Sequence, residues 1–70
     1  MNDINDQPIS FTDKSSGDDA LLGIRVVGDS VGLTLSLRAS GDVEVFMGAD
    51  EIGRVIERLQ AARAAIHPTT

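Results

Sequence analysis

Residues 41–60 read GDVEVFMGADEIGRVIERLQ, and the spacing of their apolar residues changes partway along. Val43, Val45 and Met47 fall at every second position, which is the period of a half-buried β-strand. After Gly48 the apolar residues recur every three or four positions, which is the period of an amphipathic α-helix. This stretch therefore predicts a strand that leads into a helix with no loop between them.

The junction itself carries signals for a helix start. With Gly48 as the N-cap, Glu51 occupies the acidic position of a capping box, and Met47 and Ile52 occupy the two positions of a hydrophobic staple. Asp50 as the N-cap is the alternative. The apolar stripe of the predicted helix consists of Ile52, Val55, Ile56, Leu59, Ala62 and Ile66. A proline two residues beyond the stripe ends the helix.

Two further alternating runs precede this stretch. Residues 21–27 (LLGIRVV) and 31–38 (VGLTLSLR) each place apolar side chains on one face, and Gly-Asp pairs at 28–29 and 41–42 suit tight hairpin turns. The predicted fold is α+β: a three-stranded antiparallel β-meander with one C-terminal helix that folds back and packs on one face. We expect this domain to span residues 21–67, with a C-terminal tail at 68–70.

The first twenty residues differ from the rest in composition. They carry five Asp against one Lys, so they hold −4 of the net charge of −5. Such a segment is typical of a disordered, acidic leader, and residues 13–19 are interpreted as a flexible linker. Residues 8–12 (PISFT) offer a short additional edge strand, because their apolar residues alternate and the proline stands at the start.

Composition excludes several classes of function. Residues 21–70 carry six acids and five arginines, which argues against a general polyanion binder. The chain has no Cys and one His, so we expect no metal site and no cofactor. No stretch has the pattern of a signal peptide or a membrane span, so we expect a cytoplasmic protein of a bacterial cell or a phage-infected host.

Residues 24–32 (IRVVGDSVG) resemble the first block of the GDSL hydrolase family. The resemblance implies that Ser30 attacks an ester carbonyl and that a helix follows it. A strand-like run follows here instead, and the family's late Asp-x-x-His has no counterpart before His67. A serine without a base is a poor nucleophile, so we interpret these residues as a hairpin turn and predict no enzyme. His67 suits the negative end of the helix dipole.

Arg25 and Arg38 fall on the outer face of the predicted sheet together with Phe46. An aromatic residue beside arginines is the composition of a sheet that stacks nucleic-acid bases. The overall plan is also similar to that of the single-stranded-DNA-binding transcriptional coactivators and the Whirly proteins. That resemblance implies binding of single-stranded nucleic acid on the outer face, although the basic, aromatic surface is thin here.

The function we expect is non-enzymatic protein binding, by a small inhibitor or regulator of the kind that phages and mobile elements direct against host proteins. The alternative is binding of single-stranded nucleic acid or a nucleotide on the outer sheet face of an oligomer. We expect a homodimer or higher oligomer, because a domain of this size has little core. The predicted partner or oligomer interface consists of Arg25, Thr34, Ser36, Arg38 and Phe46, with Arg54 and Arg58 on the helix in reserve.

Overall fold

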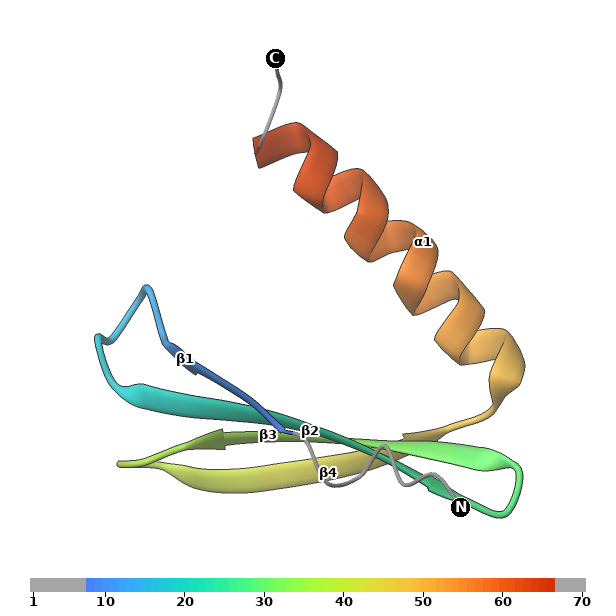
Figure 1. Ribbon diagram of the computed structural model, residues 1–70, viewed down its shortest axis with the longest axis horizontal. Coiled ribbons are helices and arrows are strands. Elements are labelled where there is room, and N and C mark those ends of the chain that lie inside the picture. Colours follow the sequence, from blue (N-terminus) through green and yellow to red (C-terminus); the bar gives the residue numbers. More distant parts are fainter. Residues whose placement is uncertain (1–7, 67–70) are drawn as a thin grey trace.

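A computed structural model describes residues 8–66 as a four-stranded antiparallel sheet followed by one helix (Figure 1). The elements are β1 (Ile9–Thr12), β2 (Asp19–Val27), β3 (Ser30–Leu37), β4 (Gly41–Met47) and α1 (Ala49–Ile66). Strands that are neighbours in the chain are neighbours in the sheet, in the order β1-β2-β3-β4. This confirms the α+β class, the meander, the C-terminal helix and the short N-terminal strand.

The connection between β1 and β2 is a tight turn rather than the expected flexible linker. The carboxylate of Asp13 accepts hydrogen bonds from the backbone N–H of Ser16 (2.8 Å) and from its hydroxyl (2.7 Å). Gly17 turns the chain with a φ of 78°, and the N–H of Asp13 donates to the carbonyl of Asp18 (2.9 Å). Short Asp and Ser side chains thus satisfy the backbone groups of the turn.

The sheet therefore reaches into the segment that we expected to be a disordered leader. Residues 9–12 form β1, and the expected domain boundary at residue 21 falls inside β2. Residues 1–7 of that leader, His67 and the expected tail at 68–70 lie outside the described residues.

The other two turns are the tight hairpins that the Gly-Asp pairs predict. Gly28 has a φ of 60° and begins the two-residue loop between β2 and β3. Val27 and Ser30, which flank this loop, pair with each other. Glycine at the first central position of a two-residue loop is typical of a type II′ turn. Gly41 has a φ of 88° at the start of β4.

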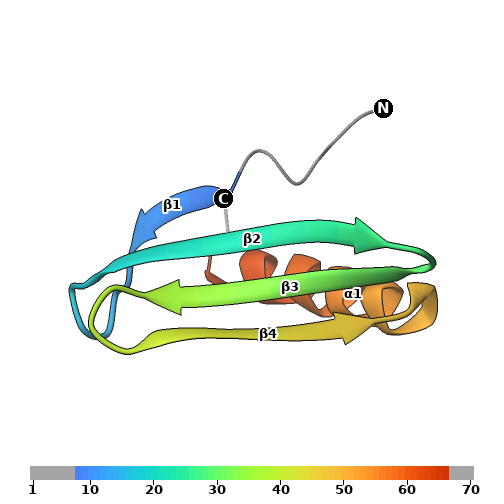
Figure 2. The same ribbon diagram turned by 90° about the horizontal axis from the view of Figure 1, so that it is seen from below.

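The strand register collects the apolar residues on one side of the sheet. Leu35 in the middle of β3 pairs with Leu22 of β2 and with Val43 of β4, and directly paired residues project to the same side. We call this side the apolar face. It consists of Ile9, Phe11, Ala20, Leu22, Ile24, Val26, Val31, Leu33, Leu35, Leu37, Val43, Val45 and Met47. The opposite side is the outer face, which is turned toward the viewer in Figure 2, with α1 behind the strands.

The helix begins as the capping signals predict. The N–H of Ile52 donates to the carbonyl of Gly48 (3.0 Å), and the carboxylate of Glu51 accepts from the N–H of Gly48 (2.9 Å). Gly48 is therefore the N-cap, and the alternative at Asp50 is not adopted. Acidic residues in the first turn and Arg63 in the last turn complement the helix dipole.

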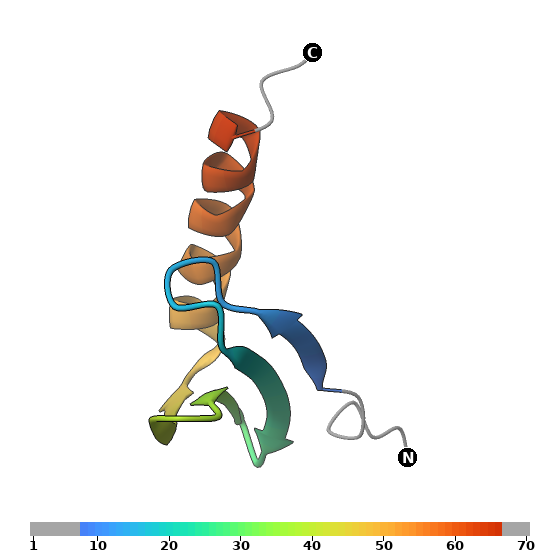
Figure 3. The same cartoon turned by 90° about the vertical axis from the view of Figure 1, so that its left-hand side faces the viewer.

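The helix packs against the sheet at one end only. It contacts β3 and β4, then rises away from the strands toward its C-terminus (Figures 1 and 3). Ile52 and Val55 are half-buried, whereas Leu59 is 63% exposed and no residue of α1 is buried. The predicted packing is confirmed for the first turns, but the helix does not cover the rest of the apolar face. In the described part of the chain no helix is long and apolar enough to cross a membrane.

Candidate functional site

The register of β2, β3 and β4 brings three of the predicted interface residues together on the outer face. Arg25 pairs with Gly32, which pairs in turn with Phe46. One step along the same face, Thr34 pairs with Glu44. These two rows form a compact polar cluster around one aromatic ring.

Glu44 holds the arginine of this cluster. The guanidinium of Arg25 donates through Nε to Oε2 of Glu44 (2.9 Å) and through Nη2 to Oε1 (3.1 Å). The hydroxyl of Thr34 donates to Oε2 of the same carboxylate (3.0 Å). The hydrogen bond from Arg25 lowers the pKa of Glu44, with a smaller effect from Thr34, and the bond to Glu44 raises the pKa of Arg25. A two-pronged bond of this kind fixes the orientation of both side chains.

Phe46 lies beneath the arginine. The Arg25 guanidinium carbon is 5.4 Å from the centre of the ring, within the range of a cation–π contact. The ring in turn covers Gly32, which is one of the few buried residues of the described chain. A Cβ at position 32 would lie 2.8 Å from the ring carbon Cε2, so a glycine is required for the ring to rest there.

The other predicted interface residues lie apart from the cluster. Ser36 is on the outer face but pairs with Leu21 and Asp42. Arg38 follows the end of β3, where its Nη1 donates to Oδ2 of Asp19 (3.0 Å) and both side chains are about three-quarters exposed. Arg54 and Arg58, the reserve residues, are exposed on α1 beside Met47 and Leu59.

The electrostatics of the outer face do not favour a polyanion. Each of its two arginines is paired with an acid, Arg25 with Glu44 and Arg38 with Asp19, and Asp42 adds a further negative charge. Binding of a polyanion requires Lys or Arg side chains that are free to neutralise its phosphates and release the counterions around them. Exposed ion pairs such as these contribute little to stability, so the cluster orients side chains more than it stabilises the fold.

Sequence reasoning missed the most unusual surface of the molecule, the uncovered part of the apolar face. Seven of its side chains are between 37% and 61% exposed: Ile9, Phe11, Ile24, Val26, Leu35, Val43 and Val45. The alternation of the strands predicted which residues lie there, but their exposure depends on the angle at which α1 leaves β4. No periodicity reports that angle.

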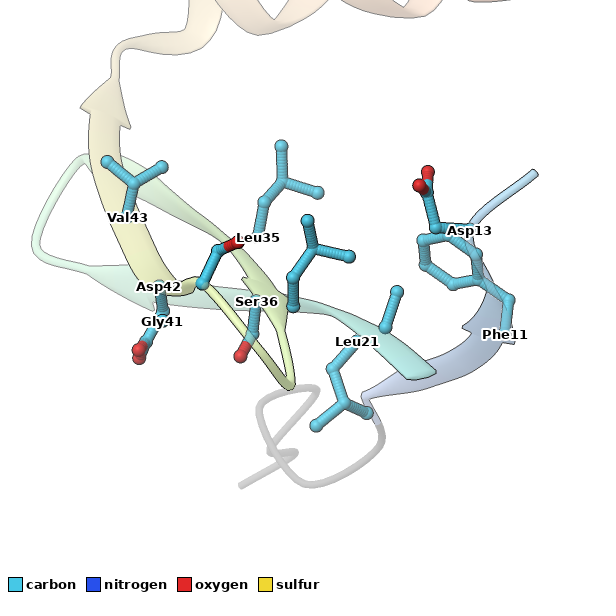
Figure 4. A pocket seen from close by; sticks show the side chains of 11 residues that line it. Phe11, Asp13, Leu21, Leu35, Ser36, Gly41, Asp42 and Val43 are labelled. Carbon is cyan, nitrogen blue, oxygen red and sulfur yellow. The ribbon is translucent and has the colours of Figure 1, made fainter. Parts of the chain in front are cut away.

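The apolar face is hollowed at the end away from the start of α1. The hollow has a volume of about 390 Å³, with apolar walls that include Phe11, Leu35, Leu37 and Val43. Figure 4 shows Leu35 and Val43 pointing to the side on which α1 lies, whereas Ser36 and Asp42 point to the other side. Asp13 and Asp42 are the charged residues at its rim, and no basic residue lines it.

The structure places the serine that the GDSL resemblance singled out in the sheet. Ser30 is the first residue of β3 and lies in a strand, where the GDSL resemblance implied a helix. Among residues 8–66 no three His, Cys, Asp or Glu side chains are grouped closely enough to hold a metal ion. The carboxylate of Asp13 has a lowered pKa because Ser16 donates to it, which reflects its role in the turn.

Comparison of the chain with protein-family models, with curated proteins and with solved structures gave no match.

Proposed function

We propose that this protein is a non-enzymatic protein-binding module, and that its binding surface is the apolar face, occupied by an amphipathic helix. One observation supports this most strongly: the part of the apolar face beyond the first turns of α1 is exposed, although its side chains are those of a core. Large contiguous apolar surfaces on soluble proteins commonly mark interaction sites.

The size of the surface supports a protein partner. An average residue exposes about 160 Å² in an unfolded chain, so seven side chains that are about half exposed leave roughly 550 Å² of the sheet uncovered. This is a large share of the roughly 800 Å² that each partner contributes to a standard interface. A small ligand in the hollow would leave most of this surface in water.

The shape and charge of the surface support a helix as the occupant. The eight residues of β3 span about 26 Å, close to the length of a helix of five turns. The hollow accepts apolar side chains, and Asp13 at its rim would attract a basic residue that flanks an apolar stripe. Apolar anchors at helical spacing are the usual means by which a helix binds a groove.

The partner that we propose in a cell is a protein rather than a nucleic acid, because the arginines of the outer face are already paired with acids. The role in disarming a host protein, as an inhibitor from a phage or a mobile element, remains our working hypothesis. We propose the cytoplasm as its compartment, because the chain uses none of the disulfides on which small secreted domains depend.

Two substitutions at adjacent positions test the binding surface. Leu35→Asp places a charge on the apolar face, whereas Ser36→Asp places the same charge on the outer face. We expect the tagged wild-type protein, purified under native conditions, to form a complex heavier than the 7.4 kDa chain. Leu35→Asp should release the free chain with its helical circular-dichroism signal retained, and Ser36→Asp should keep the complex.

Two results would contradict the proposal. One is a wild-type protein that is a free monomer in every preparation. The other is a complex that Leu35→Asp leaves intact or that Ser36→Asp disrupts equally. Binding of a single-stranded oligonucleotide that weakens steeply with salt, and that persists in Leu35→Asp, would support the nucleic-acid alternative instead.

A further inference from the structure

We infer that the occupant of the apolar face is α1 of a second copy of this chain. Two chains would form a two-fold symmetric dimer in which each helix lies on the apolar face of the other chain. This inference rests on the proposed function and names its partner.

The helix carries the surface that such a dimer requires. Its apolar stripe becomes more exposed along its length, from 50% at Ile56 to 63% at Leu59 and 77% at Ile66. The half-buried Ile52 and Val55, at the start of the stripe, lie in the turns next to the sheet. The second half of the stripe therefore has helical spacing and apolar chemistry, but its own sheet leaves it in water.

The exposed areas agree with the requirement of a stable dimer. The three helical side chains add roughly 300 Å² to the uncovered sheet, which gives roughly 850 Å² of exposed apolar surface for each chain. A standard interface buries about 800 Å² on each partner. The radius of gyration of 13.8 Å also exceeds the roughly 11 Å of a compact chain of this length, as expected for half of an interlocked pair.

The charge and the length of the exposed part of α1 also suit the apolar face of a second copy. Residues 58–66 of α1 carry Arg58 and Arg63 and no acid, a charge of +2. The lining of the hollow includes Asp13 and no base, and Asp42 lies at the same end of the sheet with its side chain on the outer face. Residues 56–66, which carry the exposed part of the stripe, span about 16 Å of helix, and this fits within the length of about 26 Å of β3.

Symmetry explains why one chain carries both surfaces. In a two-fold interface each contact occurs twice, so a chain that presents a helix and the groove for that helix pairs with itself and closes. A chain that bound only foreign helices would have no need of an unpartnered stripe on its own helix. The stripe is therefore the feature that distinguishes a second copy from another partner.

Cysteine cross-linking tests this arrangement directly, because the chain has no native cysteine. A Leu59→Cys chain is mixed with a Leu35→Cys chain or with a Val43→Cys chain, after unfolding and refolding together, and then mildly oxidised. A disulfide requires Cα atoms within about 7 Å, so it reports contact between two different chains. The matched control mixes Leu59→Cys with Ser36→Cys, whose cysteine lies on the outer face.

We expect a mixed disulfide with at least one of the two apolar-face positions and none with the control. The refolded wild-type protein alone should have twice the mass of one chain. A chain that carries both Val43→Cys and Leu59→Cys tests the opposite arrangement. An internal disulfide in a monomer of this chain would show that α1 closes onto its own sheet, and would overturn the inference. The refolded protein could instead be a monomer that forms a complex with another protein, and Leu35→Asp could disrupt that complex. This result would overturn the inference that a second copy occupies the apolar face, and it would leave the proposed function standing.

Discussion

Truncation of Leu59 to alanine measures how much the helix stripe contributes to association. Leu59 is 63% exposed in the single chain, so about 100 Å² of it is available for burial by a second copy. Alanine keeps part of this area, which leaves a loss of about 1.5–2 kcal/mol at each site. Both helices of a dimer carry the change, so the free energy of association should weaken by about 3–4 kcal/mol, or roughly 100- to 1,000-fold in Kd.

The substitution isolates association from folding. Alanine is the best helix former, so α1 itself should persist. The matched control is Gln60→Ala, which truncates an exposed neighbour that lies off the stripe and should leave Kd within about threefold of the wild type. Sedimentation equilibrium gives both constants, with refractive-index detection because the chain has neither Trp nor Tyr.

Two outcomes would refute the reasoning. Equal dissociation constants for Leu59→Ala and the wild type would show that the stripe lies outside the interface. Equal weakening by Gln60→Ala would show that the effect comes from the helix as a whole rather than from its apolar side.

Three further predictions concern the outer face and the helix start. Gly32→Ala should have a free energy of unfolding about 1 kcal/mol lower than that of Gly23→Ala, and thermal melts compare the two. The added methyl at position 32 displaces the Phe46 ring, whereas a methyl at position 23 meets only ordinary contacts. The pKa of Glu44 is lowered in the folded state, so its contribution to stability is present above its ordinary value of 4.5 and is lost as pH falls through the folded value. Unfolding curves from pH 7 to pH 2 should therefore lose part of their acid dependence in Glu44→Gln, and unchanged curves would count against the ion pair. Glu51→Ala removes the acceptor for the N-cap N–H and should cost about 1 kcal/mol in urea unfolding, whereas a loss below about 0.3 kcal/mol would be too small for a working capping box.

Local pattern predicted the elements of this fold because each element depends on its own residues. The alternation in residues 31–37 identifies a strand with one apolar face, and the register confirms that Leu33, Leu35 and Leu37 share it. The change of period at Gly48 predicted the strand-to-helix junction, and Glu51 caps it as expected. Interactions within a few residues decide these features, and such interactions can be read from sequence.

Sequence reasoning was less successful for the N-terminal segment, whose order depends on contacts with the rest of the sheet. Residues 8–20 have the composition of a disordered segment, yet Phe11 pairs with Ala20 across an ordered turn that Asp13 holds together. A polar composition does not exclude structure when each polar side chain has a local partner.

The candidate site was only partly predictable for a related reason. The alternation of the strands placed Arg25 and Phe46 on one face, but it did not reveal that Glu44 binds and neutralises the arginine. The exposed apolar face depends on the direction of α1 after a glycine N-cap. No side chain at Gly48 constrains that direction, so the pattern of the helix could not reveal it.

The most direct test of the account is a solution NMR experiment on a mixed dimer. One chain is labelled with ¹³C and the other is unlabelled, and isotope-filtered NOEs are recorded between methyl groups of different chains. We predict NOEs from Leu35 and Val43 of one chain to Leu59 and Ile66 of the other. Methyl contacts between these residues within one chain only, or no contacts between chains at all, would contradict a dimer built by α1 on the apolar face.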